Sequence, residues 1–245
     1  MAKVKIKIIF MGDMPRTFNL NKTNKWESAL FEIISNDASY TIINNSDGER
    51  WDFSDGNMEA QVPRRGDEDI LLAVANVPLQ YNYYVRRLEN NRVCMTYSEM
   101  TDILKSDNIP LENLLLRVLY SISLVYKRYD NGIPTNTDVT NYTHDDTRGC
   151  IFDMNGIKKE VIYSLNGPQL CHSCVETLHK NRIERNLIEK VQRELKGIKK
   201  DLYFRIVDWI KLQPVLAIVI SSVFAIILGI IGSITATLIL NMFKK

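Results

Sequence analysis

The C-terminal stretch from Pro214 to Lys245 limits what this chain can fold into more than any other part, and it reads PVLAIVISSVFAIILGIIGSITATLILNMFKK. Between Val215 and Phe243 no side chain is charged, and only Asn241 is strongly polar. A helix of about 29 residues would be about 44 Å long, more than the roughly 30 Å of bilayer hydrocarbon. Two spans and a turn would need more residues. The segment 213–245 therefore predicts one tilted transmembrane helix with a short tail.

Small residues recur at every fourth position of this span: Ala217, Ser221, Ala225, Gly229, Ser233 and Thr237. In lipid, helices associate where small side chains let their backbones approach closely. The row therefore predicts packing against a second copy, giving a homo-oligomer, or against the span of another membrane protein. The alternative is a partial match by chance, because Ala, Gly, Ser and Thr are common in this stretch.

Charges beside the span predict its orientation. Before it lie Lys190, Arg193, Lys196, Lys199, Lys200, Arg205 and Lys211, and beyond it only Lys244 and Lys245. By the positive-inside rule, the bulk of the chain is cytoplasmic. We expect a single-pass protein, inserted after synthesis as a tail-anchored protein is.

The residues before the span have an ordinary globular composition, with 24% charged and 45% hydrophobic residues in the whole chain. A net charge of +2 and the lack of a basic stripe with aromatic residues give no support for a nucleic-acid partner. Four cysteines, two of them spaced as CxxC, favour a metal site in a reducing compartment over a disulfide scaffold.

Strand and helix patterns alternate through residues 1–180 and predict one mixed-sheet domain of the α/β class, with α+β as the alternative. Strands are expected at 4–10, 69–77 and 92–100, the second of them buried on both faces, and a central helix from Pro110. An amphipathic helix is expected at 21–35. Hairpins are expected at 39–55 and 150–165, with Asp47-Gly48 and Asn155-Gly156 as their turns.

Residues 181–212 have a different sequence pattern, with apolar residues spaced three and four apart among alternating charges. This pattern predicts an amphipathic stalk helix, which Gly197 could kink. Its apolar face could coil with a second copy, or it could lie on the membrane with Tyr203, Phe204 and Trp209 as interfacial anchors.

A metal site is predicted around the CxxC of Cys171 and Cys174, which follows a turn after the second hairpin. That hairpin would bring Cys150 back beside Cys171. Thiolates and imidazoles are the ligands of structural zinc, so we expect Cys150, Cys171 and Cys174 with His144 or Asp145. His179 is a further candidate. Ordinary reduced thiols are the alternative, and Cys94 is expected to be plain core.

These residues resemble part of the archaemetzincin family, whose members carry HExxHxxGxxH, then Cx4C followed by Met, and later a CxxC. In HDDTRGCI, His144 falls on the third zinc-binding His, Asp145 and Cys150 on the two Cys positions, and Ile151 on the Met. Cys171 and Cys174 match the late CxxC. The resemblance covers roughly residues 65–180 and implies a zincin-like fold.

The sequence departs from that family where catalysis would occur. The helix from Pro110 contains no His and no HExxH, and Pro134–Thr143 holds no Glu-His pair. Metzincin chemistry needs three protein ligands, one open position on zinc and a Glu base. The resemblance therefore implies a pseudo-enzyme, an inactive metallopeptidase relative that keeps a structural zinc.

Two functional classes remain. The first is a membrane-anchored, catalytically inactive, zinc-stabilised sensor or effector that binds a cytosolic ligand or partner protein and oligomerises through its span; some bacterial antiviral defence proteins offer an analogy for a membrane-disrupting output. The second is a membrane-tethered, peptidase-like hydrolase that uses a metal or a Cys/His pair, with His144 and Cys150 as its candidate catalytic residues.

Overall fold

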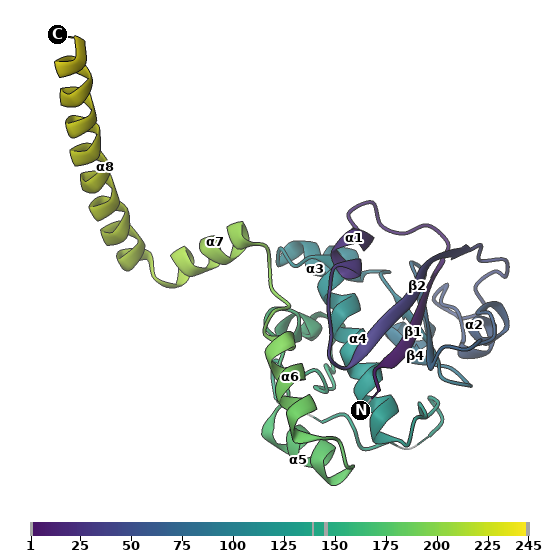
Figure 1. Cartoon of the computed structure of the whole chain (residues 1–245). Coiled ribbons are helices and arrows are strands. Elements are labelled where there is room, and N and C mark those ends of the chain that lie inside the picture. The colour runs from purple at the N-terminus through teal and green to yellow at the C-terminus, as the bar shows by residue number, and fades with distance from the viewer. Residues whose placement is uncertain (1, 139, 145–146, 244–245) are drawn as a thin grey trace. The chain divides into compact units, whose positions relative to one another are not determined.

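The computed structural model describes residues 2–138, 140–144 and 147–243 (Figure 1). The chain divides into two compact units, Met1–Lys200 and Asp201–Lys245.

The first unit is built on a five-stranded sheet with the strand order β2-β1-β3-β5-β4. The strands are β1 (Val4–Met11), β2 (Phe31–Tyr40), β3 (Ile70–Ala75), β4 (Val85–Arg87) and β5 (Arg92–Thr96). Neighbouring strands are parallel except for β4, which pairs antiparallel with β5 at one edge. This mixed sheet, with helices packed on it, confirms the predicted α/β fold class.

Both faces of the sheet are covered, which explains why β3 reads ILLAVA with every residue buried. Alternate side chains of a strand point to opposite faces, so Leu72 and Val74 join one apolar cluster while Leu71 and Ala73 join another. The larger cluster packs against the long helix α4 (Leu111–Arg128), which is buried along most of its length. The predicted central helix and doubly buried strand are thus confirmed.

Shorter helices complete the first unit: α1 (Leu20–Asn24), α2 (Asp55–Gln61), α3 (Met100–Ser106), α5 (His172–Lys180) and α6 (Arg185–Leu195). Two 3₁₀ helices, η1 (Gln80–Asn82) and η2 (Lys158–Ser164), lie in the connections. Met58 of α2 packs into the smaller apolar cluster, on the sheet face opposite α4.

The prediction of an amphipathic helix at 21–35 is wrong. Helix α1 ends at Asn24, and from Phe31 the chain forms the edge strand β2, where Phe31 pairs with Val4 and Ile33 with Ile6. Leu30 and Phe31 are buried, and the β-branched pair Ile33-Ile34 suits a strand better than a helix. Pairing with β1 outweighed the helical spacing of the apolar residues.

Both hairpin predictions are also wrong. Asp47 does not turn a hairpin; its carboxylate accepts a hydrogen bond from the Ser54 N–H at 2.8 Å, beside the start of α2. In the second segment, Asn155 has the left-handed φ of 52°, but the chain then forms η2 instead of a returning strand. Val161 and Leu165, four residues apart, are fully buried there, so packing against the core selects the helical turn.

The predicted stalk is divided between the two units. Its apolar face from Ile183 to Ile198 does not lie free, because Val191 and Leu195 of α6 and Ile198 are buried in the main core. Glu194 also fastens α6 to the first unit: its carboxylate accepts hydrogen bonds from the Ala29 N–H, the Ser28 hydroxyl and the Tyr120 hydroxyl, at 2.8, 2.9 and 2.7 Å. The first unit thus extends beyond residue 180.

The second unit contains α7 (Leu202–Leu212) and α8 (Pro214–Phe243). Helix α7 leaves large apolar side chains exposed, among them Leu202, Tyr203 and Leu212. Within the described part of the chain, α8 is long and apolar enough over Pro214–Thr237 to cross a membrane.

Candidate metal centre

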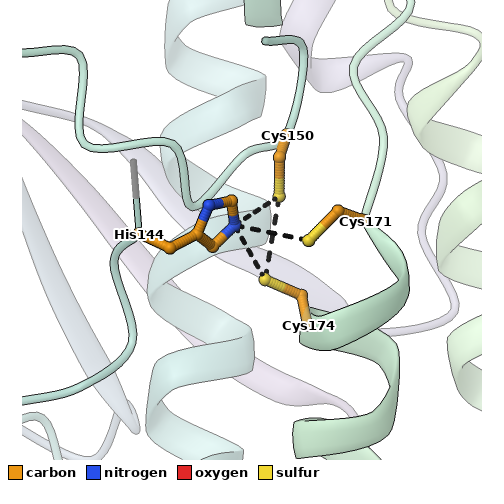
Figure 2. A group of neighbouring side chains, drawn as sticks. All are labelled: His144, Cys150, Cys171 and Cys174. Atoms are coloured by element: carbon orange, nitrogen blue, oxygen red, sulfur yellow. Dashed lines mark hydrogen bonds between the residues drawn. The ribbon is translucent and has the colours of Figure 1, made fainter. Parts of the chain in front are cut away.

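Four side chains from three separate segments converge on one point: His144, Cys150, Cys171 and Cys174 (Figure 2). Their ligand atoms all lie within 4.8 Å of one another. The Nε2 atom of His144 lies 3.3, 3.4 and 3.1 Å from the sulfurs of Cys150, Cys171 and Cys174. Cys150 and Cys174 are buried, whereas Cys171 and His144 are partly exposed at the open side.

Helix α5 positions the CxxC. Cys171 is the residue that precedes its first turn, and Cys174 lies within that turn, so both sulfurs reach the same side of the helix start. The Val175 N–H donates to the Cys171 carbonyl at 3.0 Å and fixes this turn. The N-terminal end of a helix carries partial positive charge and favours thiolates beside it.

Backbone pairing positions the other two donors. The Ile151 N–H donates to the Gln169 carbonyl at 3.0 Å, and the Gln169 N–H donates to the Gly149 carbonyl at 2.9 Å, which brings Cys150 beside the CxxC. The His144 N–H donates to Phe152 at 3.1 Å, which places His144 on the same side. The predicted neighbourhood of Cys150 and Cys171 is therefore present, although no hairpin creates it.

Gly149 is the one position of this loop where glycine is required by the backbone. Its φ of +88° lies in the left-handed region, and a Cβ there would lie 3.4 Å from the Tyr163 carbonyl oxygen. This conformation turns the chain immediately before Cys150.

The donor set fits zinc. Tetrahedral zinc with Zn–S bonds of about 2.3 Å and Zn–N bonds of about 2.0–2.1 Å requires S–S edges of about 3.8 Å and N–S edges of about 3.6 Å. The Cys150 and Cys174 sulfurs are 3.8 Å apart, and the three N–S distances of 3.1–3.4 Å are slightly shorter. Three thiols and one imidazole are a donor set typical of structural zinc.

The electrostatics of the four-donor cluster favour a cation. The hydrogen bond that Cys150 shares with Cys174 lowers the pKa of the Cys150 thiol to about 5, and the same bond with burial raises the pKa of Cys174. The two shifts have opposite directions because the same hydrogen bond stabilises the thiolate of Cys150 and the thiol of Cys174. A zinc ion would replace the thiol protons, which makes its binding dependent on pH.

Of the remaining candidate ligands that the structure describes, His179 is not part of this cluster. Asp145 lies outside the described residues. His179 is exposed near the C-terminal end of α5, and His172 pairs with Glu176 instead, at 3.2 Å. Cys94 is fully buried in β5, where burial raises the pKa of its thiol to about 12, so it is a core residue as predicted.

The sequence reading missed a second polar group, on α4. Arg117 is buried in the most apolar helix of the first unit, with its Nε 2.7 Å from the Ser164 hydroxyl and its Nη1 2.8 Å from the Tyr84 hydroxyl. The signal that could have revealed it is a lone arginine inside an otherwise apolar helical repeat, because a buried guanidinium needs polar partners.

Comparison with known proteins gives one distant likeness. No family model matches the sequence, and no curated protein matches it. Among solved structures, the crystal structure of archaemetzincin from Methanopyrus kandleri superposes with a TM-score of 0.43 and 14% sequence identity. The match covers 74% of this chain and 96% of the other.

Proposed function

We propose that this protein is a single-pass membrane protein whose zinc-stabilised cytoplasmic domain has no catalytic activity and acts as a sensor or effector through oligomerisation of its span. The observation that carries the proposal is the closed set of four protein donors at His144, Cys150, Cys171 and Cys174, in a chain that also has a membrane-length apolar helix. In this proposal the folded domain detects a ligand or partner, and α8 responds by oligomerising in the membrane.

The closed donor set supports a structural role for the metal. A catalytic zinc keeps one coordination position for water, whereas four protein donors fill a tetrahedral ion. Helix α4 contributes no histidine, and the three histidines of the chain are His144, His172 and His179. A second, open zinc site of the HExxH type cannot be assembled from them.

The span supports association in lipid. The hydroxyls of Ser221 and Thr237 donate to the carbonyls four residues earlier, at 2.6 and 2.9 Å, so these two members of the row leave no unsatisfied hydroxyl proton in hydrocarbon. At Gly229 a Cβ would meet no atom within 4 Å, so the backbone there is open to a neighbouring helix. Close packing of two such backbones is the contact that small residues permit.

One observation favours the hydrolase as a second candidate. The Nε2 atom of His144 lies 3.3 Å from the Cys150 sulfur, a distance within reach of a Cys/His nucleophile pair, and the pKa of that thiol is lowered to about 5 by its bond with Cys174. Against this candidate, Cys150 is fully buried, and the same nitrogen faces two further sulfurs. A nucleophile must be reached by its substrate, so the metal site is the better explanation.

Alkylation separates the two candidates. Iodoacetamide added to the purified full chain should leave Cys150, Cys171 and Cys174 unmodified until zinc is removed with a chelator. Mass spectrometry locates the modified residues. Rapid alkylation of Cys150 alone in the zinc-replete protein, together with peptidase activity lost in Cys150→Ser, would establish the hydrolase and refute the inactive domain.

Cross-linking in membranes tests whether the chain oligomerises through α8. Gly229→Ile places a bulky side chain on the row and should reduce the cross-linked oligomer at least about tenfold, because it separates the backbones. Thr235→Ile is the matched control, since it adds bulk about 120° around the helix from Gly229. Equal oligomer yields in wild type and Gly229→Ile would exclude association through the row.

A further inference from the structure

A cavity of about 360 Å³ lies in the first unit, apart from the zinc-donor cluster. Strand β4, helix α4 and the segment 151–154 contribute its walls, together with Ile133, Asn136, Thr140, Tyr142 and Thr143. Its volume is within the range of small-molecule sites, which is about 300–1,000 Å³. The lining combines tyrosine rings with three arginines, Arg86, Arg87 and Arg117.

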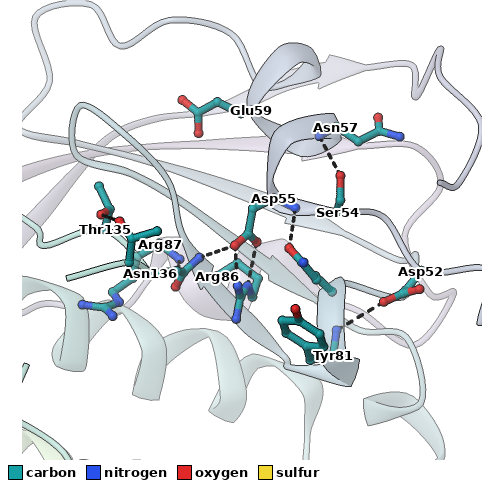
Figure 3. A network of polar contacts seen from close by, with 12 residues as sticks. Asp52, Ser54, Asp55, Asn57, Glu59, Tyr81, Arg86, Arg87, Thr135 and Asn136 are labelled. Carbon is teal, nitrogen blue, oxygen red and sulfur yellow. Dashed lines mark hydrogen bonds and ion pairs between the residues drawn. The ribbon is translucent and has the colours of Figure 1, made fainter. Parts of the chain in front are cut away.

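Arg86 is already neutralised. Its Nε donates to the Asp55 carboxylate at 2.6 Å, and its Nη2 forms an ion pair with the same group (Figure 3). The Asn136 side-chain amide also donates to Asp55, at 3.0 Å. Arg86 therefore shapes the wall of the cavity, but its charge is balanced within the fold.

Arg117 has no such counter-ion. It is 3% exposed and donates to two neutral hydroxyls, those of Ser164 and Tyr84. Among the described residues it has no carboxylate within ion-pair distance, and its Nη2 makes no hydrogen bond with them. A guanidinium cannot lose its proton in a protein, so an uncompensated positive charge remains at this wall.

Arg87 forms no ion pair within 4.0 Å among the described residues; the nearby Asp138 carboxyl has its pKa lowered mainly by hydrogen bonds from Thr135 and only to a smaller extent by Arg87. Its Nη1 atom is buried and has no hydrogen-bond partner in the described chain, and its guanidinium carbon lies 5.3 Å from the centre of the Tyr142 ring. Leaving a buried donor without a partner is unfavourable, and more so when the donor is charged. A ligand that accepted this hydrogen bond would remove that cost.

The carboxylate of the cavity does not cancel these charges. Asp153 lies in the wall, with its buried Oδ2 3.8 Å from Nη1 of Arg148 and without a hydrogen-bond partner among the described residues; Arg148 itself pairs more closely with Glu160, at 2.7 Å. With Asp55 paired to Arg86, the guanidinium groups of Arg87 and Arg117 outnumber the one carboxylate of the described lining, that of Asp153, so the cavity keeps a net positive charge.

We propose that this cavity binds a small molecule that carries an oxyanion, a phosphate or a carboxylate, on a ring-shaped body. Arginine presents planar paired donors that match these groups, and the rings of Tyr83, Tyr84 and Tyr142 supply flat surfaces for the body of the ligand. The proposal deepens the proposed function, because it names a ligand class for the sensor domain. The cavity is its physical basis and does not depend on the span.

The site is connected to the zinc centre through the backbone. Ile151, which follows Cys150 directly, lines the cavity together with Phe152 and Asp153, and the Phe152 carbonyl accepts a hydrogen bond from the His144 N–H. A ligand in the cavity would therefore touch the segment that positions two of the four donors.

Calorimetry on the full chain in a neutral maltoside detergent tests the proposal, with phenyl phosphate, benzoate and uncharged benzyl alcohol as probes. Phenyl phosphate or benzoate should bind saturably at one per chain, and benzyl alcohol should not. Arg87→Gln should weaken binding of the anion at least tenfold. Arg185→Gln is the matched control, because it removes the same charge at an exposed ion pair on α6 and should leave binding unchanged.

Arg87→Lys distinguishes a loss of ligand contacts from a loss of folding. It keeps the charge but loses the paired donors, so its affinity should lie between wild type and Arg87→Gln, with an unchanged thermal midpoint. Saturable binding of one anion alone assigns the ligand to phosphate esters or to carboxylic acids. Absent binding of both anions, or equal binding by wild type and Arg87→Gln, overturns the site. Zinc content and cross-linking are measured separately and do not depend on either of these results. A cavity that binds no anion can therefore be distinguished from an error in the proposed function.

Discussion

Replacing Cys174 with serine should release zinc from the first unit. Structural zinc sites contribute an apparent binding free energy of about 10–16 kcal/mol. If the four donors share this about equally, losing one thiolate costs about 2.5–4 kcal/mol. That cost weakens zinc binding roughly 100- to 1,000-fold. At free zinc well above the variant's weakened dissociation constant, the free energy of unfolding falls by the same amount, about 2.5–4 kcal/mol.

Elemental analysis of the purified chain gives the zinc content, and competition with a chromophoric chelator gives the affinity. Urea unfolding with and without zinc gives the change in stability. Wild type should contain one zinc per chain and lose stability when the chelator removes it. Cys174→Ser should contain little zinc and respond only at high zinc concentration.

Cys94→Ser is the matched control, because Cys94 is a fully buried cysteine in β5, away from the cluster. Placing a hydroxyl there without a partner costs about 1–3 kcal/mol, so this variant should also lose stability. It should nevertheless keep its zinc with wild-type affinity. Wild-type zinc content in Cys174→Ser, or a wild-type stability that is indifferent to zinc, would refute the assignment of these donors.

Three further perturbations test how the two units are held and placed. Glu194→Ala removes three hydrogen bonds to one carboxylate and should lower the free energy of unfolding by about 2–4 kcal/mol in urea, whereas Glu189→Ala on the exposed face of α6 should change it by less than about 0.5 kcal/mol. Gly197→Ala should cost about 1–3 kcal/mol by the same measurement, because its Cβ would lie 3.1 Å from the Trp26 ring; unchanged stability would contradict this packing. In lipid vesicles the Trp209 fluorescence should be blue-shifted if α7 lies in the interface, and emission typical of water, identified by its loss in Trp209→Ala, would exclude that placement.

The sequence pattern predicted the structure correctly where the residue types in a segment favour only one structure. The continuous apolar run ILLAVA predicts a strand that is buried on both faces. The apolar repeat of α4 predicts a central helix. For the metal centre, the sequence predicted Cys150, Cys171 and Cys174 with His144 or Asp145 as the fourth donor, and the structure brings the three cysteines together with His144. Donor chemistry can be read from residue types, because thiols and imidazoles have few other reasons to cluster.

Local patterns failed where two structures suit the same residues. The segment from Trp26 to Ser35 has helical apolar spacing, yet pairing with β1 makes part of it a strand. Asn155-Gly156 is a strong hairpin signal, yet burial of Val161 and Leu165 favours η2. In both cases the free energy of burial and pairing depends on a partner that is distant in the sequence.

The sequence by itself determined the two ends of the functional argument: an apolar helix of membrane length, and a donor set that suits zinc. Both depend on composition within a short stretch, which no tertiary contact can change. Only the tertiary structure decided that α6 belongs to the folded domain, because Glu194 finds its partners at Ser28 and Ala29, just before β2, and at Tyr120 of α4, while the buried face of α6 joins the main apolar cluster. Only the tertiary structure placed Arg87 and Arg117 at one cavity. Whether a charged side chain is compensated depends on which groups lie beside it in space, and the sequence does not show these neighbours.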